Sequence, residues 1–364
     1  VQHYLPWRVQ YKDSVSSPAR PVFDASSKTP LLPDGRGGTV GGRCFNDINC
    51  KGKINTLDFL NMVLRWELGP EAFCCDLKGF YTSIWLDPDQ YHLQRVLWKE
   101  GLNPGSDIEE LVLVTLIFGV RAVSALSERA VLMLADYISK SLPRLAELLQ
   151  KSRFVDDIAD SLSKMAAIEE LIESADKVFE SVGLQCKGWS KSGHAPHPDV
   201  TSDGRGVDVG GMTWYTKLYQ ISVKIPRLHF SKKVRGRISV GADIFEGSFS
   251  DLNNFVPKKL TRRQVVSKFS SVYDPFGKFL PITSRMKVHM RRAVAETEIW
   301  DGILTAETRS IWVKNFWMLE KLRGMKFSRA RVPVDALNHD LQLIAAVDAS
   351  SELKIAGVWA RFMR

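Results

Sequence analysis

The residues with the clearest chemical potential are two adjacent acids, Asp156 and Asp157, in the stretch 153–160. They stand in a short apolar run that predicts a strand, a turn and a second strand. Two neighbouring carboxylates repel each other, so this setting is unfavourable unless a cation neutralises both. Both can approach one site only at the turn of a hairpin, because side chains alternate along a strand. Mg2+ would suit these oxygens; the alternative is a solvated turn with two acids.

A third acid, Asp76, follows an apolar run at residues 72–75, as a carboxylate at the end of a buried strand would. If Asp76 meets Asp156 and Asp157 in space, the three could hold two metal ions about 4 Å apart for in-line displacement at phosphorus. The spacing favours this chemistry, but it does not by itself bring the acids together.

The elements that must position these acids alternate between strands and helices without regular βαβ repeats. Residues 81–86 and 184–187 predict strands, and residues 165–182 predict a helix whose apolar stripe packs on the sheet. Gly183 would then end this helix as a C-terminal cap. The pattern predicts an α+β fold with helices on one face of a sheet.

Length and composition limit the kinds of protein that this chain can be. The chain has 364 residues, of which 45% are hydrophobic and 25% charged, so it is long enough for two or three domains. Five cysteines without a CxxC pair indicate a reducing compartment and no structural zinc. The sequence shows neither a signal peptide nor a membrane span, and both ends resemble cuts in a longer polypeptide.

The net charge of +9 suits a polyanionic partner. Residues 224–237 contain six Lys or Arg and no acid, and residues 258–292 contain ten with Asp274 as the one acid. The second segment predicts helices, with Thr261 as an N-cap and a break at 274–277. Aromatic residues among these cations favour contact with nucleic acid over a merely solvated face.

Arginines near the N-terminus, Arg20, Arg36 and Arg43, either reach the triphosphate of a nucleotide or are ordinary surface charges. The two interpretations stay open at this point, with Arg20 the strongest candidate of the three.

An ordered set of motifs resembles the reverse transcriptase of Pao/BEL LTR retrotransposons over nearly the whole chain. The motifs are Arg20 with Phe23-Asp24-Ala25-Ser26, Phe45-Asn46-Asp47, Asp76 with Tyr81, Phe118-Gly119, Phe154-Val155-Asp156-Asp157, Lys187 with Trp189, Gly210-Gly211-Met212-Thr213-Trp214, Leu260-Thr261-Arg262-Arg263-Gln264 and Tyr273-Asp274-Pro275-Phe276-Gly277.

The resemblance implies a right-hand polymerase with fingers, palm and thumb, and it implies roles for individual residues. The implied metal ligands for two Mg2+ ions, with Mn2+ as a substitute, are Asp76, Asp156, Asp157 and Leu77. Lys187 would complete the catalytic set as a proton donor to pyrophosphate. The implied nucleotide-binding residues are Arg20, Arg43, Tyr81 and Gly119, and the implied primer grip is Gly211, Met212, Thr213 and Trp214.

The resemblance also implies the domain order. Residues 1–225 would form fingers and palm, 226–337 a basic, mainly helical thumb and connection, and 338–364 the truncated start of an RNase H-like domain. Asp348 resembles the first carboxylate of that domain. Because the other RNase H acids are missing, no RNase H activity is expected of this fragment.

The expected function is RNA-directed DNA polymerisation by a retroelement. Expected partners are an RNA template, a DNA primer or product, dNTPs and other polyprotein segments, without a membrane. The expected location is intracellular, in a cytoplasmic retroelement particle or the nucleus. Departures from the family pattern, with Phe118 where retroviral relatives carry Gln and no Ser-Ser-x-Pro after Gly119, favour an alternative. That alternative is a catalytically decayed or domesticated protein that binds nucleic acid.

Overall fold

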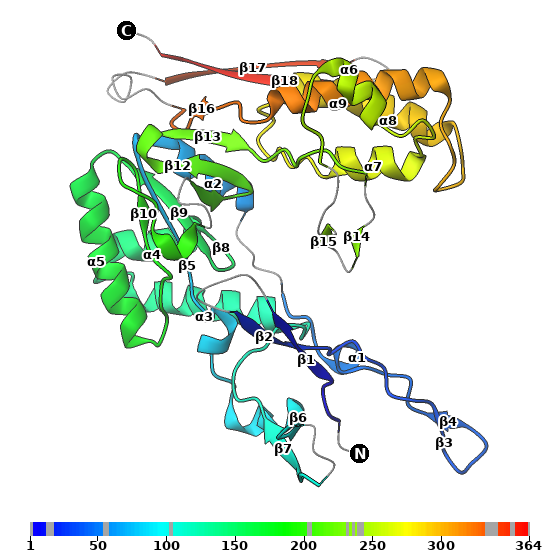
Figure 1. Cartoon of the computed structure of the whole chain (residues 1–364). Coiled ribbons are helices and arrows are strands. Elements are labelled where there is room, and N and C mark those ends of the chain that lie inside the picture. The colour runs from blue at the N-terminus through cyan, green and yellow to red at the C-terminus, as the bar shows by residue number, and fades with distance from the viewer. Residues whose placement is uncertain are drawn as a thin grey trace. The chain divides into compact units, whose positions relative to one another are not determined.

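The structure is a computed structural model that divides into two compact units, Val1–Arg205 and Gly206–Arg364 (Figure 1). It describes residues 3–11, 18–53, 58–101, 105–201, 206–230, 233–234, 237–238, 244–331, 341–349 and 354–362. Each unit mixes helices with antiparallel strand pairs, in agreement with the α+β prediction.

The first unit is organised around a four-stranded sheet in the order β10-β5-β9-β8. Its strands are β5 (Glu71–Asp76), β8 (Arg153–Phe154), β9 (Asp157–Leu162) and β10 (Ser190–Lys191). Three two-stranded sheets accompany it: β1 (Trp7–Tyr11) with β2 (Ala19–Phe23), β3 (Leu32–Pro33) with β4 (Thr39–Val40), and β6 (Arg95–Lys99) with β7 (Ile108–Val112). The middle residues of the central strands β5 and β9 are buried; those of β5 are apolar, whereas β9 also buries Asp160 and Ser161.

The first unit contains five helices among its described residues, and all but α1 belong to the layers around this sheet. They are α1 (Phe45–Ile48), α2 (Phe59–Leu68), α3 (Val123–Ile138), α4 (Pro143–Lys151) and α5 (Met165–Ser181), with the 3-10 turns η1 (Tyr81–Ser83), η2 (Pro88–Leu93) and η3 (Pro198–Val200). One core joins α3, α4 and α5 to β5 and β9, and α2 packs against β9 separately (Figure 1). Each fully buried side chain such as Phe73 or Leu148 contributes about 1.5–3 kcal/mol to this packing.

The predicted helix at 165–182 is confirmed as α5, and Gly183 follows it with φ +75°. The predicted strand at 81–86 is wrong, because the chain turns into η1 there. Gly79 adopts φ +57°, and its carbonyl accepts bonds from the Ser83 amide and the Thr82 hydroxyl. The predicted strand at 184–187 is reduced to one bridge between Leu77 and Cys186.

The second unit combines a sheet in the order β11-β12-β13-β16 with a group of helices. The strands are β11 (Val207–Val209), β12 (Met212–Tyr215), β13 (Gln220–Val223), β14 (Lys233–Val234), β15 (Arg237–Ile238), β16 (Phe327–Ser328), β17 (Leu341–Ala349) and β18 (Lys354–Phe362). The helices are α6 (Phe249–Phe255), α7 (Arg262–Ser270), α8 (Leu280–Ala295) and α9 (Ala306–Leu322), with η4 (Thr216–Leu218) after β12. Their shared core includes Trp312 and Phe316.

Two local signals in this unit are confirmed. Thr261 caps α7 in a capping box with Gln264. The break before α8 follows from Asp274, whose carboxylate accepts the amides of Lys278 and Phe279 at 2.9 and 2.8 Å. Among the described helices, none combines the length and apolar character that a membrane crossing requires.

Candidate active site at the β8–β9 turn

The register of the first sheet brings the predicted acids to one edge. Strand β5 pairs with β9 so that Asp76 lies opposite Asp157, and Phe154 in β8 also pairs with Asp157. The amide of Leu77 donates to the Asp156 carbonyl at 2.9 Å. Acids 80 positions apart in the chain are therefore neighbours at the turn between β8 and β9.

The turn itself has an unusual backbone. Val155 and Asp156 form the loop between β8 and β9, and Val155 adopts φ +58°. A β-branched residue is unfavourable in this left-handed region, so neighbouring contacts must hold it there. The Val155 side chain packs against the main core of the unit, and its carbonyl accepts a bond of 2.7 Å from Arg153.

The carboxylates of Asp156 and Asp76 interact electrostatically. Burial and then the negative charge of Asp76 raise the pKa of Asp156, while Lys187 and Arg20 partly oppose the shift. Asp76 Oδ2 accepts a bond of 2.5 Å from Lys187 Nζ. Asp76 Oδ1 is buried and finds no hydrogen-bond partner among the described residues. Asp157, opposite Asp76, is exposed.

These residues fit a hard divalent cation in part. Asp76 Oδ1 is a buried oxygen without a hydrogen-bond partner among the described residues, and a cation would supply one. Burial and then the charge of Asp76 raise the pKa of Asp156, and a cation would favour its ionised form. Burial raises the pKa of the neighbouring Cys74 and Cys75 thiols, which keeps both thiols protonated in this structure. Across the described residues, however, no group of three or more His, Cys, Asp or Glu could hold a metal ion. The roles of Asp157 and Leu77 as ligands stay predictions.

Lys187 reaches Asp76 because its segment runs beside the end of β5. The Lys187 amide donates to the Asp76 carbonyl at 2.9 Å, and the Lys78 amide donates to Gln185 at 2.7 Å. Backbone and side chain thus both hold Lys187 against Asp76. Cys186 lies beside Cys75, with their sulfur atoms 3.1 Å apart and both thiols free.

A pocket of about 300 Å3 opens beside these groups. Its charged lining is Asp156, Arg20, Lys78 and Lys187, and its aromatic lining is Phe23, Phe80 and Phe118. A cavity with three cations beside a carboxylate suits a ligand that carries several negative charges and a flat ring. The sequence analysis assigned no binding role to Lys78 or Phe118. The position of Lys78, two residues after Asp76, was the sequence feature that could have identified it as part of the site.

Phe118 links two of the predicted nucleotide-binding residues. Its ring is 4.9 Å from the Tyr81 ring in an edge-on arrangement, and the Arg20 guanidinium lies 5.9 Å from its centroid. Tyr81 does not line the pocket. Burial, then the charges of Asp156 and Glu128, raise the pKa of Tyr81, which keeps its phenol neutral.

Gly119 has a structural reason to lack a side chain. It adopts φ +99°, and a Cβ there would lie 2.5 Å from the Phe23 carbonyl oxygen. Its own carbonyl accepts a bond of 2.9 Å from Asn46 Nδ2. Arg43 is exposed and does not line the pocket. The structure therefore gathers Arg20 with the acids and leaves Arg43 apart.

The predicted primer grip forms a hairpin in the second unit. Gly211 lies in the turn between β11 and β12 with φ +79°, where a Cβ would lie 2.3 Å from the Tyr273 ring. Met212 and Trp214 are buried in β12, and Thr213 between them is half-buried. Asp348 lies in β17, opposite Ile355 of β18.

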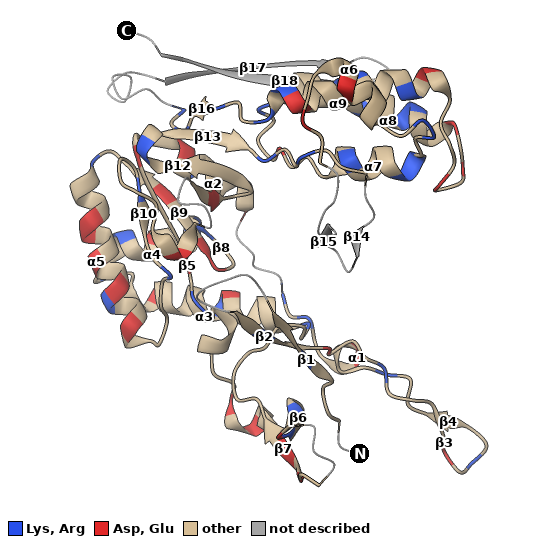
Figure 2. Ribbon diagram, viewed as in Figure 1, with Lys and Arg blue, Asp and Glu red and all other residues tan. Residues whose placement is uncertain are grey.

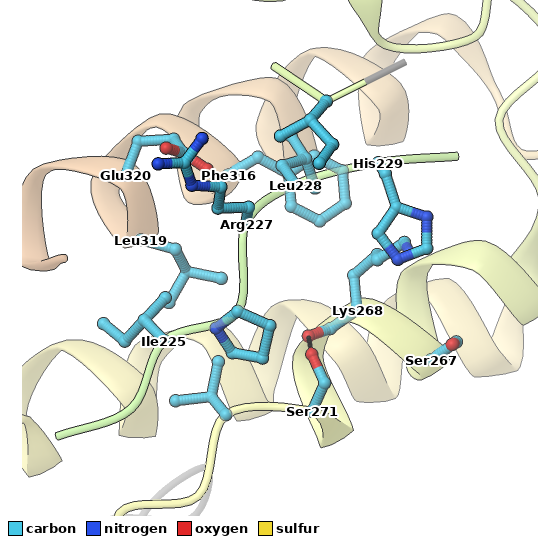
Figure 3. A pocket seen from close by; sticks show the side chains of 13 residues that line it. Ile225, Arg227, Leu228, His229, Ser267, Lys268, Ser271, Phe316, Leu319 and Glu320 are labelled. Carbon is cyan, nitrogen blue, oxygen red and sulfur yellow. Dashed lines mark hydrogen bonds between the residues drawn. The ribbon is translucent and has the colours of Figure 1, made fainter. Parts of the chain in front are cut away.

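A second pocket, of about 160 Å3, lies within the second unit (Figure 3). Lys268 from α7 points toward His229, with Nζ 3.2 Å from Nε2, and Arg227 and Glu320 lie at another side of the pocket (Figure 3). Burial raises the pKa of Glu320, the one carboxyl among the residues that line it. This pocket therefore lacks the paired carboxylates of the first unit.

Comparison with known proteins agrees with this fold. Two solved structures are similar: the foamy viral protease-reverse transcriptase dRH in complex with double-stranded DNA, and the foamy viral protease-reverse transcriptase in complex with an RNA/DNA hybrid. Each has a TM-score of 0.50 and 13% identity; they cover 91% and 99% of this chain. The chain spans 50% and 40% of those two proteins. The mixed helix and strand fold of this chain thus resembles that of these two foamy viral proteins.

The family model described as Pao retrotransposon-like RNaseH-like domain matches residues 261–364. This match over residues 261–364 and the likeness of fold agree with the predicted resemblance to a retroelement region with an RNase H-like part. No curated protein matches the chain. The matched range begins before the predicted start of that domain at 338, and the predicted boundaries stay predictions.

Proposed function

We propose that this chain is an RNA-directed DNA polymerase that transfers a nucleotide onto a primer 3′-hydroxyl. The observation that supports it best is one pocket in which Asp156, beside Asp76, shares the lining with Arg20, Lys78 and Lys187. Residues 1–225 would then supply fingers and palm, and the basic helices within residues 226–337 would supply the thumb and connection.

The protein's own groups have distinct roles in this proposal. Arg20 and Lys78 bind the triphosphate; the support for this role is that both line the pocket and can supply the counter-charges that the phosphates of a dNTP need. Lys187 lies between Asp76 and the pocket and donates a proton to the departing pyrophosphate. Phe118 lines the pocket and Tyr81 packs edge-on against it, so in this proposal the pair limits the space at the sugar and favours deoxynucleotides over ribonucleotides.

Asp76 and Asp156, with Asp157 and the backbone oxygen of Leu77, would hold Mg2+ or Mn2+. Bound there, two such ions would activate the primer hydroxyl and neutralise charge on the leaving group. The hairpin from Gly211 would hold the primer strand. Template RNA, primer DNA and dNTPs are the partners that this activity requires.

One contact favours the second candidate, a decayed or domesticated protein that binds nucleic acid without catalysis. The Asp76 carboxylate is already neutralised by Lys187 at 2.5 Å, so the site is charge-balanced by the chain itself. A non-catalytic protein would bind primer-template in a salt-sensitive manner that is indifferent to divalent metal.

A primer-extension assay tests the proposal. Wild-type protein and Asp156→Asn are compared on RNA and DNA templates with Mg2+ or Mn2+. We expect extension by the wild type on RNA and loss of extension in the variant, while primer-template affinity is retained. Equal extension by both proteins would exclude the assigned site, and metal-indifferent binding without extension would support the second candidate.

A further inference from the structure

We propose that Arg153 is a positioning residue for Asp156. Its guanidinium, held by Glu128, fixes the backbone of the turn through the Val155 carbonyl. This inference rests on the proposed polymerase function and assigns a role to residues that touch neither the metal nor the nucleotide in that proposal.

The geometry of the guanidinium is specific. Nη1 and Nη2 of Arg153 donate to the two carboxylate oxygens of Glu128 at 3.0 and 2.6 Å. Nη1 also donates to the Val155 carbonyl at 2.7 Å. Only a planar fork with several donors can satisfy a carboxylate at two points and a backbone carbonyl together.

Burial makes this contact rigid. The side chains of Arg153 and Glu128 are 0% and 1% exposed, in β8 and α3 respectively. Charges removed from water are strongly attracted when paired, and each is very costly to leave alone. The guanidinium is therefore held in one position, and through it α3 fixes the position of the turn.

The turn needs such a constraint. Val155 holds φ +58°, a conformation that costs a β-branched residue free energy and relaxes if nothing opposes it. Asp156 is the next residue, so a change in Val155 ψ moves the Asp156 backbone and carboxylate directly. The bond from Arg153 to the Val155 carbonyl acts at the peptide unit that joins these two residues.

The same guanidinium also contacts the predicted sugar-facing side of the site. It lies 5.9 Å from the centroid of the Phe80 ring, and Phe80 packs against Tyr81 at 5.6 Å. Arg153 thus connects the turn with the segment that carries Tyr81. Stability alone is a poor explanation for the pair, since apolar residues of similar volume often stabilise a core equally well.

The decisive experiment replaces the pair by apolar residues of similar volume, Arg153→Met with Glu128→Leu. This double variant leaves no unpaired buried charge, so we expect it to fold with a near wild-type Tm. Because the Val155 carbonyl loses its donor, we expect kcat for primer extension to fall roughly 10–100-fold, with far less change in KM for dNTP.

A matched control uses another ion pair that joins a helix to this sheet. Arg144 in α4 bonds Asp160 in β9 at 3.1 Å, and Asp160 is 2% exposed, but the pair does not touch the turn. We expect Arg144→Met with Asp160→Asn to keep its kcat. A second variant, Arg153→Lys, keeps the charge beside Glu128 without the fork, and we expect about tenfold loss of kcat.

The outcomes separate the two proposals. If wild-type protein extends no primer, the proposed function fails. If the wild type is active and the Arg153/Glu128 double variant matches it in kcat, the positioning role is refuted. If the double variant does not fold, Arg153→Lys decides: loss of kcat at an unchanged Tm supports the role, and wild-type kcat refutes it.

Discussion

Replacement of Gly119 by alanine tests whether the pocket depends on close packing of the chain behind Phe118. Alanine at φ +99° costs about 1–2 kcal/mol for the unfavourable backbone conformation. Its Cβ would also lie 2.5 Å from the Phe23 carbonyl oxygen. Relief of that overlap must move β2 or the Gly119 segment, which adds about 1–3 kcal/mol, as overpacking does elsewhere.

Gly183→Ala supplies a control for the backbone cost alone. Gly183 has φ +75° with no atom within 4 Å of an added Cβ, and it belongs to the same unit. The difference in unfolding free energy between the two variants therefore isolates the overlap with Phe23. For a unit of this size we expect Gly119→Ala to melt about 2–12 °C below Gly183→Ala.

The functional consequence is measured by nucleotide kinetics. Phe23 and Phe118 line the same pocket, so their separation should raise KM for dNTP in Gly119→Ala and leave it unchanged in Gly183→Ala. Thermal unfolding followed by circular dichroism and steady-state primer extension provide the two readouts. Equal Tm and equal KM for the two variants would show that the overlap does not constrain the pocket.

Three further predictions concern other parts of the site. Burial and the charge of Asp76 raise the pKa of Asp156, so the ionised Asp156 carboxylate destabilises the folded protein when no divalent metal is bound. Asp156→Asn removes that charge and should raise Tm at neutral pH. The gain in Tm should vanish below the ordinary Asp pKa, where the carboxyl is protonated in both folded and unfolded protein. Unfolding curves from pH 3 to 8 check this sign. Tyr81→Ala should increase ribonucleotide incorporation, and unchanged selectivity in single-nucleotide extension would contradict its place beside the sugar. Arg285→Ala with Lys287→Ala should weaken primer-template binding and lower the log–log salt slope by about 1 for each phosphate that is no longer neutralised, measured by anisotropy.

The exposed cations of α8 give the last of these predictions its basis. Arg285 and Lys287 are exposed in this helix, and Figure 2 shows basic positions along α7 and α8. In α7, by contrast, Arg262 donates to the Thr297 and Glu298 carbonyls and Arg263 pairs with Asp301. The count of cations in a sequence therefore overstates the charge available to a partner.

The sequence was most informative for charged residues beside apolar runs, because a carboxylate is favourable in few such environments. Acids at the ends of apolar runs predicted that Asp76 and the 156–157 turn share a site, and the strand register brings them together. The helix at 165–182 followed from its periodicity. The segment 81–86 has equally apolar residues, but the left-handed Gly79 redirects it, and propensity does not reveal that turn.

The partner of a buried charge is harder to predict. Arg153 is charged within an apolar run, which signals that a partner exists. Glu128 lies 25 positions away in α3, and a single sequence does not select it among the acids of the chain. The lining of the pocket likewise depends on how β2 and the Phe118 segment pack, which no local pattern encodes.

The bond between Lys187 and Asp76 has a consequence for ion exchange at this edge of the sheet. The chain provides its own tethered counter-ion, so the acidic end of β5 stays neutralised whether or not a diffusible cation is present. Any magnesium ion that binds Asp76 must compete with the Lys187 ammonium group, which is part of the same chain and therefore has a high effective concentration. The site should therefore need a higher concentration of divalent ions to fill than it would without Lys187, while the fold around it should not depend on those ions.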